Sequence, residues 1–174
     1  MKNRTLRQIT AAGVIAAAYA ALSLVLAPIT FGAVQCRVSE ALTLLPVLSP
    51  AAIWGVTLGC AITNGVGAAT GANFLGMVDL FVGTAATLLA AVVSRLLGRI
   101  RIGRAPWLSA LPPILFNAVA IGAEWCYAAT GSINVAFWVF AGQIALGQLL
   151  PCLLGVWLVT LLERRGLQTI IEGK

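Results

Sequence analysis

The sequence has 174 residues, of which 60% are apolar and only 9% are charged, and its formal net charge is +6. Soluble domains are about half apolar and a quarter charged, so this composition excludes a water-soluble globular fold. A chain of this length can instead bury its apolar surface in lipid as one bundle of transmembrane helices, with little left over for a separate soluble domain. We therefore expect a single transmembrane domain over residues 1–174.

The basic residues lie mostly in three clusters between the apolar segments. These clusters are Lys2, Arg4 and Arg7, then Arg95, Arg99, Arg101 and Arg104, and finally Arg164 and Arg165. Lys and Arg next to transmembrane segments mark the cytoplasmic side, where they meet lipid head groups. The charge therefore indicates orientation and contact with membrane lipid rather than nucleic-acid binding. The sequence has no histidine and only four scattered cysteines, so it offers no zinc-ligand spacing and implies no metal or other cofactor.

Transmembrane helices are expected over about 9–27, 39–48, 51–66, 77–97, 107–129 and 133–162. The first run follows basic residues, as in a signal peptide. No small-residue cleavage site ends it, so we interpret it as a retained span.

The region between Glu40 and Asp79 needs two helices. Its 38 uncharged residues would form about 57 Å of α-helix, about twice the thickness of the hydrocarbon core. Pro46 and Pro50 divide this region near its start, which predicts a short helix followed by a longer one. The short helix, 39–48, reaches only about half of the core as an α-helix, as a partly re-entrant segment sheltered by its neighbours would.

Charge parity gives independent support for this division. The N-terminal basic cluster and the cluster at 95–104 should share the cytoplasmic face, which requires an even number of crossings between them. Four helices satisfy this condition and three do not. Two further helices return Arg164 and Arg165 to the same face. The predicted fold is an all-α integral membrane protein, a bundle of six transmembrane helices with both termini in the cytoplasm.

Polar residues inside the predicted spans are costly in lipid, so each is a candidate site residue. They are Arg37, Glu40, Asn64, Asp79, Asn117, Glu124, Gln143 and Gln148. In the orientation above most of them lie toward the outer face, where they would line a cavity together with aromatic residues such as Trp125, Tyr127, Phe137 and Trp138. An unprotonated site with this excess of carboxylates favours a cation or a ligand rich in hydrogen-bond donors.

Several of these residues also have purely structural interpretations. Arg37 and Glu40 are three residues apart and are spaced to pair on a helix, while Asp79 suits the first turn of a helix. The amides are equally suited to hydrogen bonds between helices, and the tryptophans to anchoring at the membrane interface. Glu124 has no basic neighbour one turn away, which favours a functional role.

The first helix has small residues every four positions, at Ala12, Ala16 and Ala20, with a second stripe at Gly13, Ala17 and Ala21. Small residues at this spacing let another helix approach closely. The first stripe is therefore predicted either to dock a partner subunit or to pack within the bundle. No phosphate-binding loop and no nucleophile with histidine is present, so the sequence indicates no enzyme, and any active transport takes its energy from elsewhere.

Residues 28–46, PITFGAVQCRVSEALTLLP, resemble the segment after the first helix in the QueT family, the substrate-binding (S) components of energy-coupling-factor (ECF) transporters. Similar stretches follow at Gly55 to Asn64, at Asp79 to Thr87, and at Leu111-Pro112-Pro113 with Asn117 and Glu124. The resemblance covers most of the chain, and Arg-Val-Ser-Glu-Ala-Leu at 37–42 is its most specific part.

This resemblance implies a multi-pass protein of the bacterial plasma membrane that takes up a queuosine precursor, 7-aminomethyl-7-deazaguanine. It also implies as partners a membrane coupling subunit, which contacts the alanine face of the first helix, and two ATPases. In such systems the S component topples in the membrane. A guanine-like edge and a cationic amine suit two carboxylates, so we expect Glu124 and Glu40 to divide these contacts.

Other classes of function remain as alternatives. The main one is a self-contained channel or ion-coupled carrier for an organic cation, although the chain is short for a carrier and shows no inverted repeat. A membrane enzyme lacks a complete catalytic constellation here, and a structural or signalling subunit would bind no small molecule.

Overall fold

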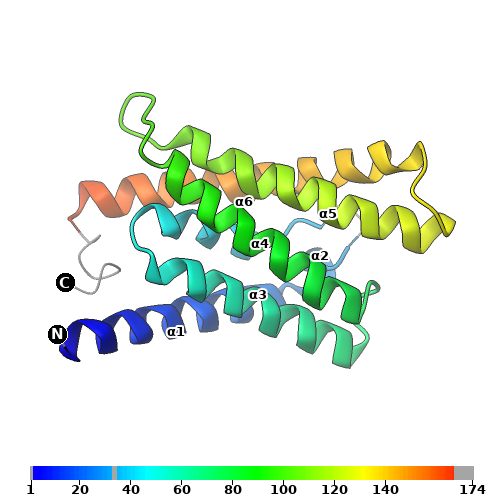
Figure 1. Cartoon of the computed structure of the whole chain (residues 1–174), viewed down its shortest axis with the longest axis horizontal. Coiled ribbons are helices and arrows are strands. Elements are labelled where there is room, and N and C mark those ends of the chain that lie inside the picture. The colour runs from blue at the N-terminus through cyan, green and yellow to red at the C-terminus, as the bar shows by residue number, and fades with distance from the viewer. Residues whose placement is uncertain (1, 33–34, 167–174) are drawn as a thin grey trace.

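Five long apolar helices dominate the computed structural model, which describes residues 2–32 and 35–166 (Figure 1). The elements in order are α1 Lys2–Val25, α2 Ala27–Thr30, the 3₁₀-helix η1 Val38–Val47, α3 Ala51–Thr70, α4 Met77–Leu97, the 3₁₀-helix η2 Trp107–Ala110, α5 Leu111–Thr130 and α6 Ala136–Arg164. Apart from one isolated bridge between Ile102 and Ala105, the described residues form no β-structure. The prediction of an all-helical membrane protein is confirmed.

The short second helix differs from the predicted form. It is a 3₁₀-helix of ten residues, with Pro46 inside it. Because a 3₁₀-helix rises about 2.0 Å per residue, η1 covers about 20 Å, roughly two thirds of a 30 Å hydrocarbon core. Where the sequence predicted six transmembrane helices, the described part of the chain thus has five helices of spanning length, and η1 takes the place of the sixth.

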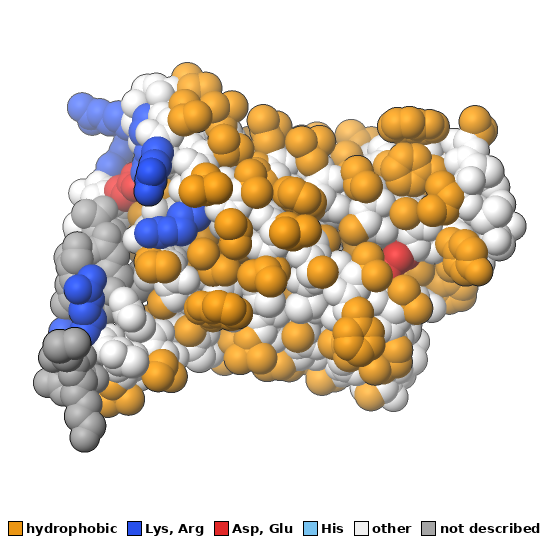
Figure 2. Space-filling model, viewed as in Figure 1, with side chains coloured by type: hydrophobic (Ala, Val, Ile, Leu, Met, Phe, Trp, Pro, Cys, Tyr) orange, Lys and Arg blue, Asp and Glu red, His pale blue; other side chains and the backbone are white. Residues whose placement is uncertain are grey.

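The helices alternate in direction along the bundle (Figure 1). The start of α1, the turn between η1 and α3, the loop between α4 and α5, and the end of α6 all lie at one end, and Figure 2 shows Lys and Arg side chains gathered there. At this end Arg101 of the α4–α5 loop forms an ion pair with Glu163 of α6, at 2.8 Å. The basic clusters therefore share one end of the molecule, as the parity argument requires.

η1 lies inside the bundle, where it packs against α1, α3, α4 and α6. Its Glu40, Thr43 and Leu44 are almost fully buried. Gly155 of α6 makes this possible, because a Cβ at that position would lie 2.6 Å from the Ala41 carbonyl oxygen. A short irregular helix at membrane depth is tolerated when surrounding protein shelters its backbone, and η1 meets this condition.

α3 is longer than predicted, ending at Thr70 instead of near residue 66. The helix stops at Gly71, whose φ of +73° is the left-handed conformation that commonly ends helices. Gly67 does not break the helix. It makes room for the Phe31 ring, whose Cζ would lie 2.5 Å from a Cβ at that position.

α1 and α3 pack closely through small residues. Gly55 and Gly59 of α3 face α1 so closely that an added Cβ would lie 2.9 Å from the carbonyl oxygens of Ala12 and Ala16, respectively. This contact bears on the two interpretations of the alanine stripe on α1. Ala16 and Ala20 of the first stripe are buried in the bundle, at 2% and 7% exposed, and Ala12 is half-buried, which favours the internal-packing interpretation. The stripe exposed on α1 is the second one, Gly13, Ala17 and Ala21.

We expect Gly59→Ala to destabilise the protein, because its Cβ would lie 2.6 Å from Cβ of Tyr19. Overpacking of this kind costs about 1–3 kcal/mol, which thermal unfolding in detergent would detect as a lower midpoint. Gly65→Ala is the matched control on the same helix, since its Cβ would find its nearest neighbour, a Leu80 methyl, at 3.8 Å. Equal midpoints for the two variants would contradict the packing.

Candidate functional site

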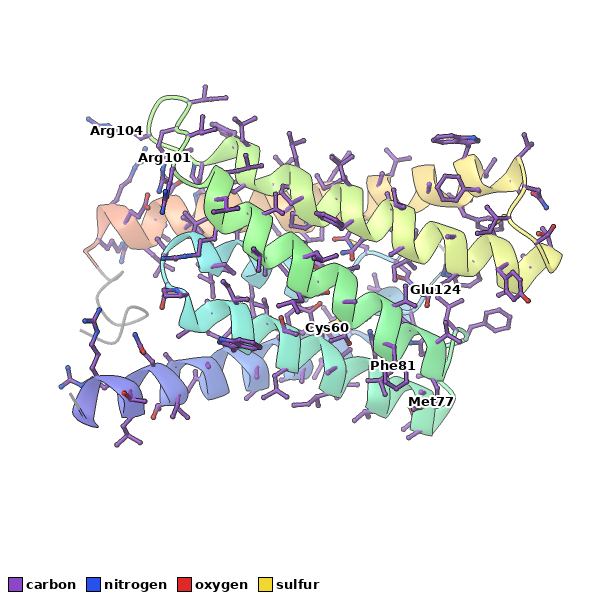
Figure 3. The ribbon with its side chains drawn as sticks, viewed as in Figure 1. Cys60, Met77, Phe81, Arg101, Arg104 and Glu124 are labelled. Carbon is purple, nitrogen blue, oxygen red and sulfur yellow. The ribbon has the colours of Figure 1, made fainter. Side chains whose placement is uncertain are left out.

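The structure brings five of the predicted polar residues into one buried region between η1, α3, α4 and α5. They are Arg37, Glu40, Asn64, Asp79 and Asn117, each at most 4% exposed. This region lies away from the basic end. Figure 3 labels Cys60 near the middle of the bundle and Arg101 and Arg104 at its basic end.

Arg37 precedes η1 and pairs with Asp79 of α4, not with Glu40 as its spacing allowed. Nη2 of Arg37 lies 3.6 Å from Oδ2 of Asp79, and the guanidinium also stands 5.7 Å from the centre of the Phe31 ring. The two charges share a setting in which both side chains are almost inaccessible to solvent. Removing charges from water is costly, and a close opposite charge offsets much of that cost.

Asp79 is held mainly by structural contacts. Its Oδ2 accepts a hydrogen bond of 2.7 Å from the Asn73 amide, and its backbone oxygen accepts one of 2.9 Å from Asn64. Its Oδ1 lies against Gly83, where an added Cβ would collide with it. These contacts orient Asp79 toward Arg37 and fix the loop before α4, which favours a positioning role over direct ligand contact.

Glu40 is held differently, because only one of its carboxylate oxygens is engaged. Oε1 accepts a hydrogen bond of 2.7 Å from the Tyr19 hydroxyl. The Asn117 amide lies beside the carboxylate, yet Oε2 has no hydrogen-bond partner among the described residues. One oxygen of a fixed carboxylate is thus left to accept a hydrogen bond from a ligand.

Cys60 and Tyr19 are members of the cluster that the sequence did not reveal. The Cys60 sulfur lies 3.6 Å from Nη1 of Arg37, 3.5 Å from Nδ2 of Asn64 and 3.3 Å from the Thr87 hydroxyl. In the sequence Cys60 was only one of four scattered cysteines. For Tyr19, the available signal was a single phenolic hydroxyl in an alanine-rich helix.

Glu124 lies at the edge of this region, on α5 beside α4 (Figure 3). It lines a groove of about 500 Å³ whose other walls are apolar, including Phe74, Val78, Val82 and Tyr127. Both carboxylate oxygens are buried and without a hydrogen-bond partner in the described parts of the chain. An ionisable group so placed is available to a ligand that brings its own donors.

Trp125 stacks with two other aromatic rings. Its ring stacks on Phe74, with centroids 5.4 Å apart, and on Phe140 at 6.3 Å. Its indole nitrogen is buried and finds no acceptor among residues 2–32 and 35–166. This N–H edge of Trp125 is therefore available to donate a hydrogen bond to a ligand.

The residues predicted on α6 are not gathered into the cluster by any hydrogen bond or ion pair within the described residues. Trp138 is 74% exposed and meets Phe137 edge to face at 5.1 Å, while Gln143 is half-buried. Gln148 is buried instead, with its Oε1 unpartnered in the part of the chain that the structure describes. That part also holds no group of three His, Cys, Asp or Glu residues able to bind a metal ion.

A sequence model of the QueT transporter family matches residues 9–164. The chain belongs to the QueT transporter family. The match includes α2 to α6 and most of α1, so every residue of the buried cluster lies within it. Membership confirms the resemblance seen in the sequence and makes the chain a membrane transport protein, not a member of an enzyme family. No curated protein and no solved structure matches the chain.

In this QueT-family protein, breaking the buried ion pair should cost far more than breaking the exposed one. Asp79→Asn keeps an acceptor for Asn73 but leaves Arg37 without its counter-charge, which costs about 3–5 kcal/mol at buried sites. Glu163→Gln removes a partly exposed pair with Arg101 and should cost at most about 1 kcal/mol. Thermal midpoints in detergent measure both effects, and a smaller loss for Asp79→Asn would refute this account of the pair.

Proposed function

We propose that the chain is the substrate-binding subunit of an ECF-type importer in a bacterial plasma membrane, and that it binds a queuosine precursor, 7-aminomethyl-7-deazaguanine, from the outer side. A coupling subunit and two ATPases supply the energy. The QueT family supports this proposal. The sequence itself contains no phosphate-binding loop with which to use ATP.

The observation that carries the proposal is a set of buried acceptors left without partners within the described residues. They include Oε2 of Glu40, both carboxylate oxygens of Glu124 and Oδ1 of Asn64. Oδ1 of Asp79 also lacks a partner there, and it lies against Gly83. Buried acceptors without partners are costly, so a ligand that brings donors gains affinity there. The proposed substrate has a ring N–H next to an exocyclic amino group, and a cationic amine, which match such a site.

The two glutamates can divide these donors according to how each is held. Glu124 has two available oxygens, which suits bidentate contact with the paired N–H groups of the guanine-like edge. Glu40 has one available oxygen because Tyr19 occupies the other, which suits the ammonium group. The buried N–H of Trp125 and the unpaired Nε of Arg37 are donors for the ring carbonyl.

The exposed stripe Gly13, Ala17 and Ala21 on α1 is our proposed contact with the coupling subunit. Close approach of two helices in lipid needs small residues at this spacing. The stripe lies on the side of α1 that the bundle leaves open, whereas Ala16 and Ala20 serve internal packing.

Purified protein should bind 7-aminomethyl-7-deazaguanine in isothermal titration calorimetry, with guanine weaker and an unrelated vitamin such as thiamine not bound. Absence of binding to any deazapurine would remove the substrate from the proposal. In liposomes the protein alone should not accumulate the ligand. Uptake without partner subunits or ATP would instead indicate the self-contained carrier.

The roles of the two glutamates can be separated with 7-deazaguanine, which lacks the aminomethyl group. Glu124→Gln should weaken both deazapurines about tenfold to a hundredfold, the equivalent of about 1.5–3 kcal/mol for a hydrogen bond to a charged group. Glu40→Gln should weaken only the aminated ligand. Glu163→Gln, at the opposite end of the bundle, is the control. Unchanged affinities in Glu124→Gln would disprove its role.

A further inference from the structure

A second concave site lies at the basic end, where η1 meets the end of α4. It has a volume of about 430 Å³, and its lining residues are Val47, Arg95, Leu96, Gly98, Arg99 and Arg101. We call it the basic groove. It lies far along the bundle from Glu124, on the side of the molecule where Figure 2 shows Lys and Arg side chains and Figure 3 labels Arg101.

The basic groove carries an excess of positive charge. Arg101 is neutralised by a two-point contact with Glu163, at 2.8 and 3.0 Å. Arg95 donates from Nη1 to the Pro46 carbonyl at 2.7 Å, which fixes its position without neutralising it. The guanidinium of Arg99 forms no hydrogen bond or ion pair with the rest of the described chain, and this residue is exposed. Two uncompensated guanidinium groups therefore face the groove.

An exposed apolar stripe on α4 leads away from this groove. Leu89, Val92 and Leu96 are 51%, 39% and 57% exposed. Their spacing of three and four residues places them on one face of the helix, and Leu96 lines the groove together with Arg99. A molecule seated at Arg99 can therefore extend an apolar chain along α4 toward the middle of the bundle.

We propose that the basic groove binds the phosphate of an anionic phospholipid, with an acyl chain lying along Leu89, Val92 and Leu96. Guanidinium groups bind phosphate oxygens through paired N–H donors, and Arg95 is already held in place for this contact. The position at one end of the bundle matches the level of the lipid head groups. Arg95 donates a hydrogen bond to the Pro46 carbonyl of η1. A lipid bound to Arg95 would therefore stabilise the contact between η1 and the end of α4.

The test is a titration of purified protein in detergent with phosphatidylglycerol, followed by native mass spectrometry, with phosphatidylcholine as the neutral lipid. We expect phosphatidylglycerol to be retained preferentially, and Arg99→Gln to weaken its binding about tenfold, the loss of one charge-assisted contact. Arg99 has no structural contact to lose, so this variant should fold normally. Arg104→Gln is the matched control, because Arg104 is exposed on the same loop but does not line the groove.

Three results would overturn the proposal. Equal losses in the Arg99 and Arg104 variants would show attraction to the overall charge instead of a site. Equal retention of both lipids would remove the role of the anionic head group. In the third result, millimolar inorganic phosphate or glycerol phosphate displaces bound phosphatidylglycerol as effectively as added phosphatidylglycerol does. That result would indicate a phosphate site in which the acyl chain takes no part.

Discussion

The buried ion pair between Arg37 and Asp79 is the interaction on which the interior of this protein depends. Neither charge is stable alone inside an apolar bundle, so the chain must bring them together. Their contact joins the start of η1 to the first turn of α4. Asn73 and Asn64 then hold Asp79. The polar cluster is therefore a constrained structure, and its remaining unpartnered atoms are available at fixed positions.

Close packing around a short central helix provides the rest of the constraint. η1 lies among four longer helices. Gly155 lets α6 approach η1, and Gly55 and Gly59 let α3 approach α1. Since lipid tails are as apolar as the helices, such contacts stabilise a membrane bundle through packing rather than through the hydrophobic effect. This packing fixes the position of the buried polar cluster relative to the basic end.

The distribution of polar groups is consistent with the proposed role as the substrate-binding subunit of an importer. One part of the bundle holds buried acceptors that have no donor among the described residues, and the other end carries arginines. In the proposed importer the first part receives the substrate and the basic end faces the cytoplasm. In the same proposal the exposed stripe Gly13, Ala17 and Ala21 of α1 contacts the coupling subunit. This arrangement separates binding, orientation and coupling onto different surfaces of the same bundle.

The sequence by itself determined the membrane class, the division of residues 39–66 into two helices, the shared end of the basic clusters and the family. These properties depend on the lengths of apolar runs and on local motifs. Only the tertiary structure decided that Arg37 pairs with Asp79, that Tyr19 holds Glu40, that Trp138 points outward and that Ala16 packs inside. The reason is physical. Helices that are apolar on nearly every side carry no periodic signal to show which face turns inward, so packing against distant segments sets their rotation.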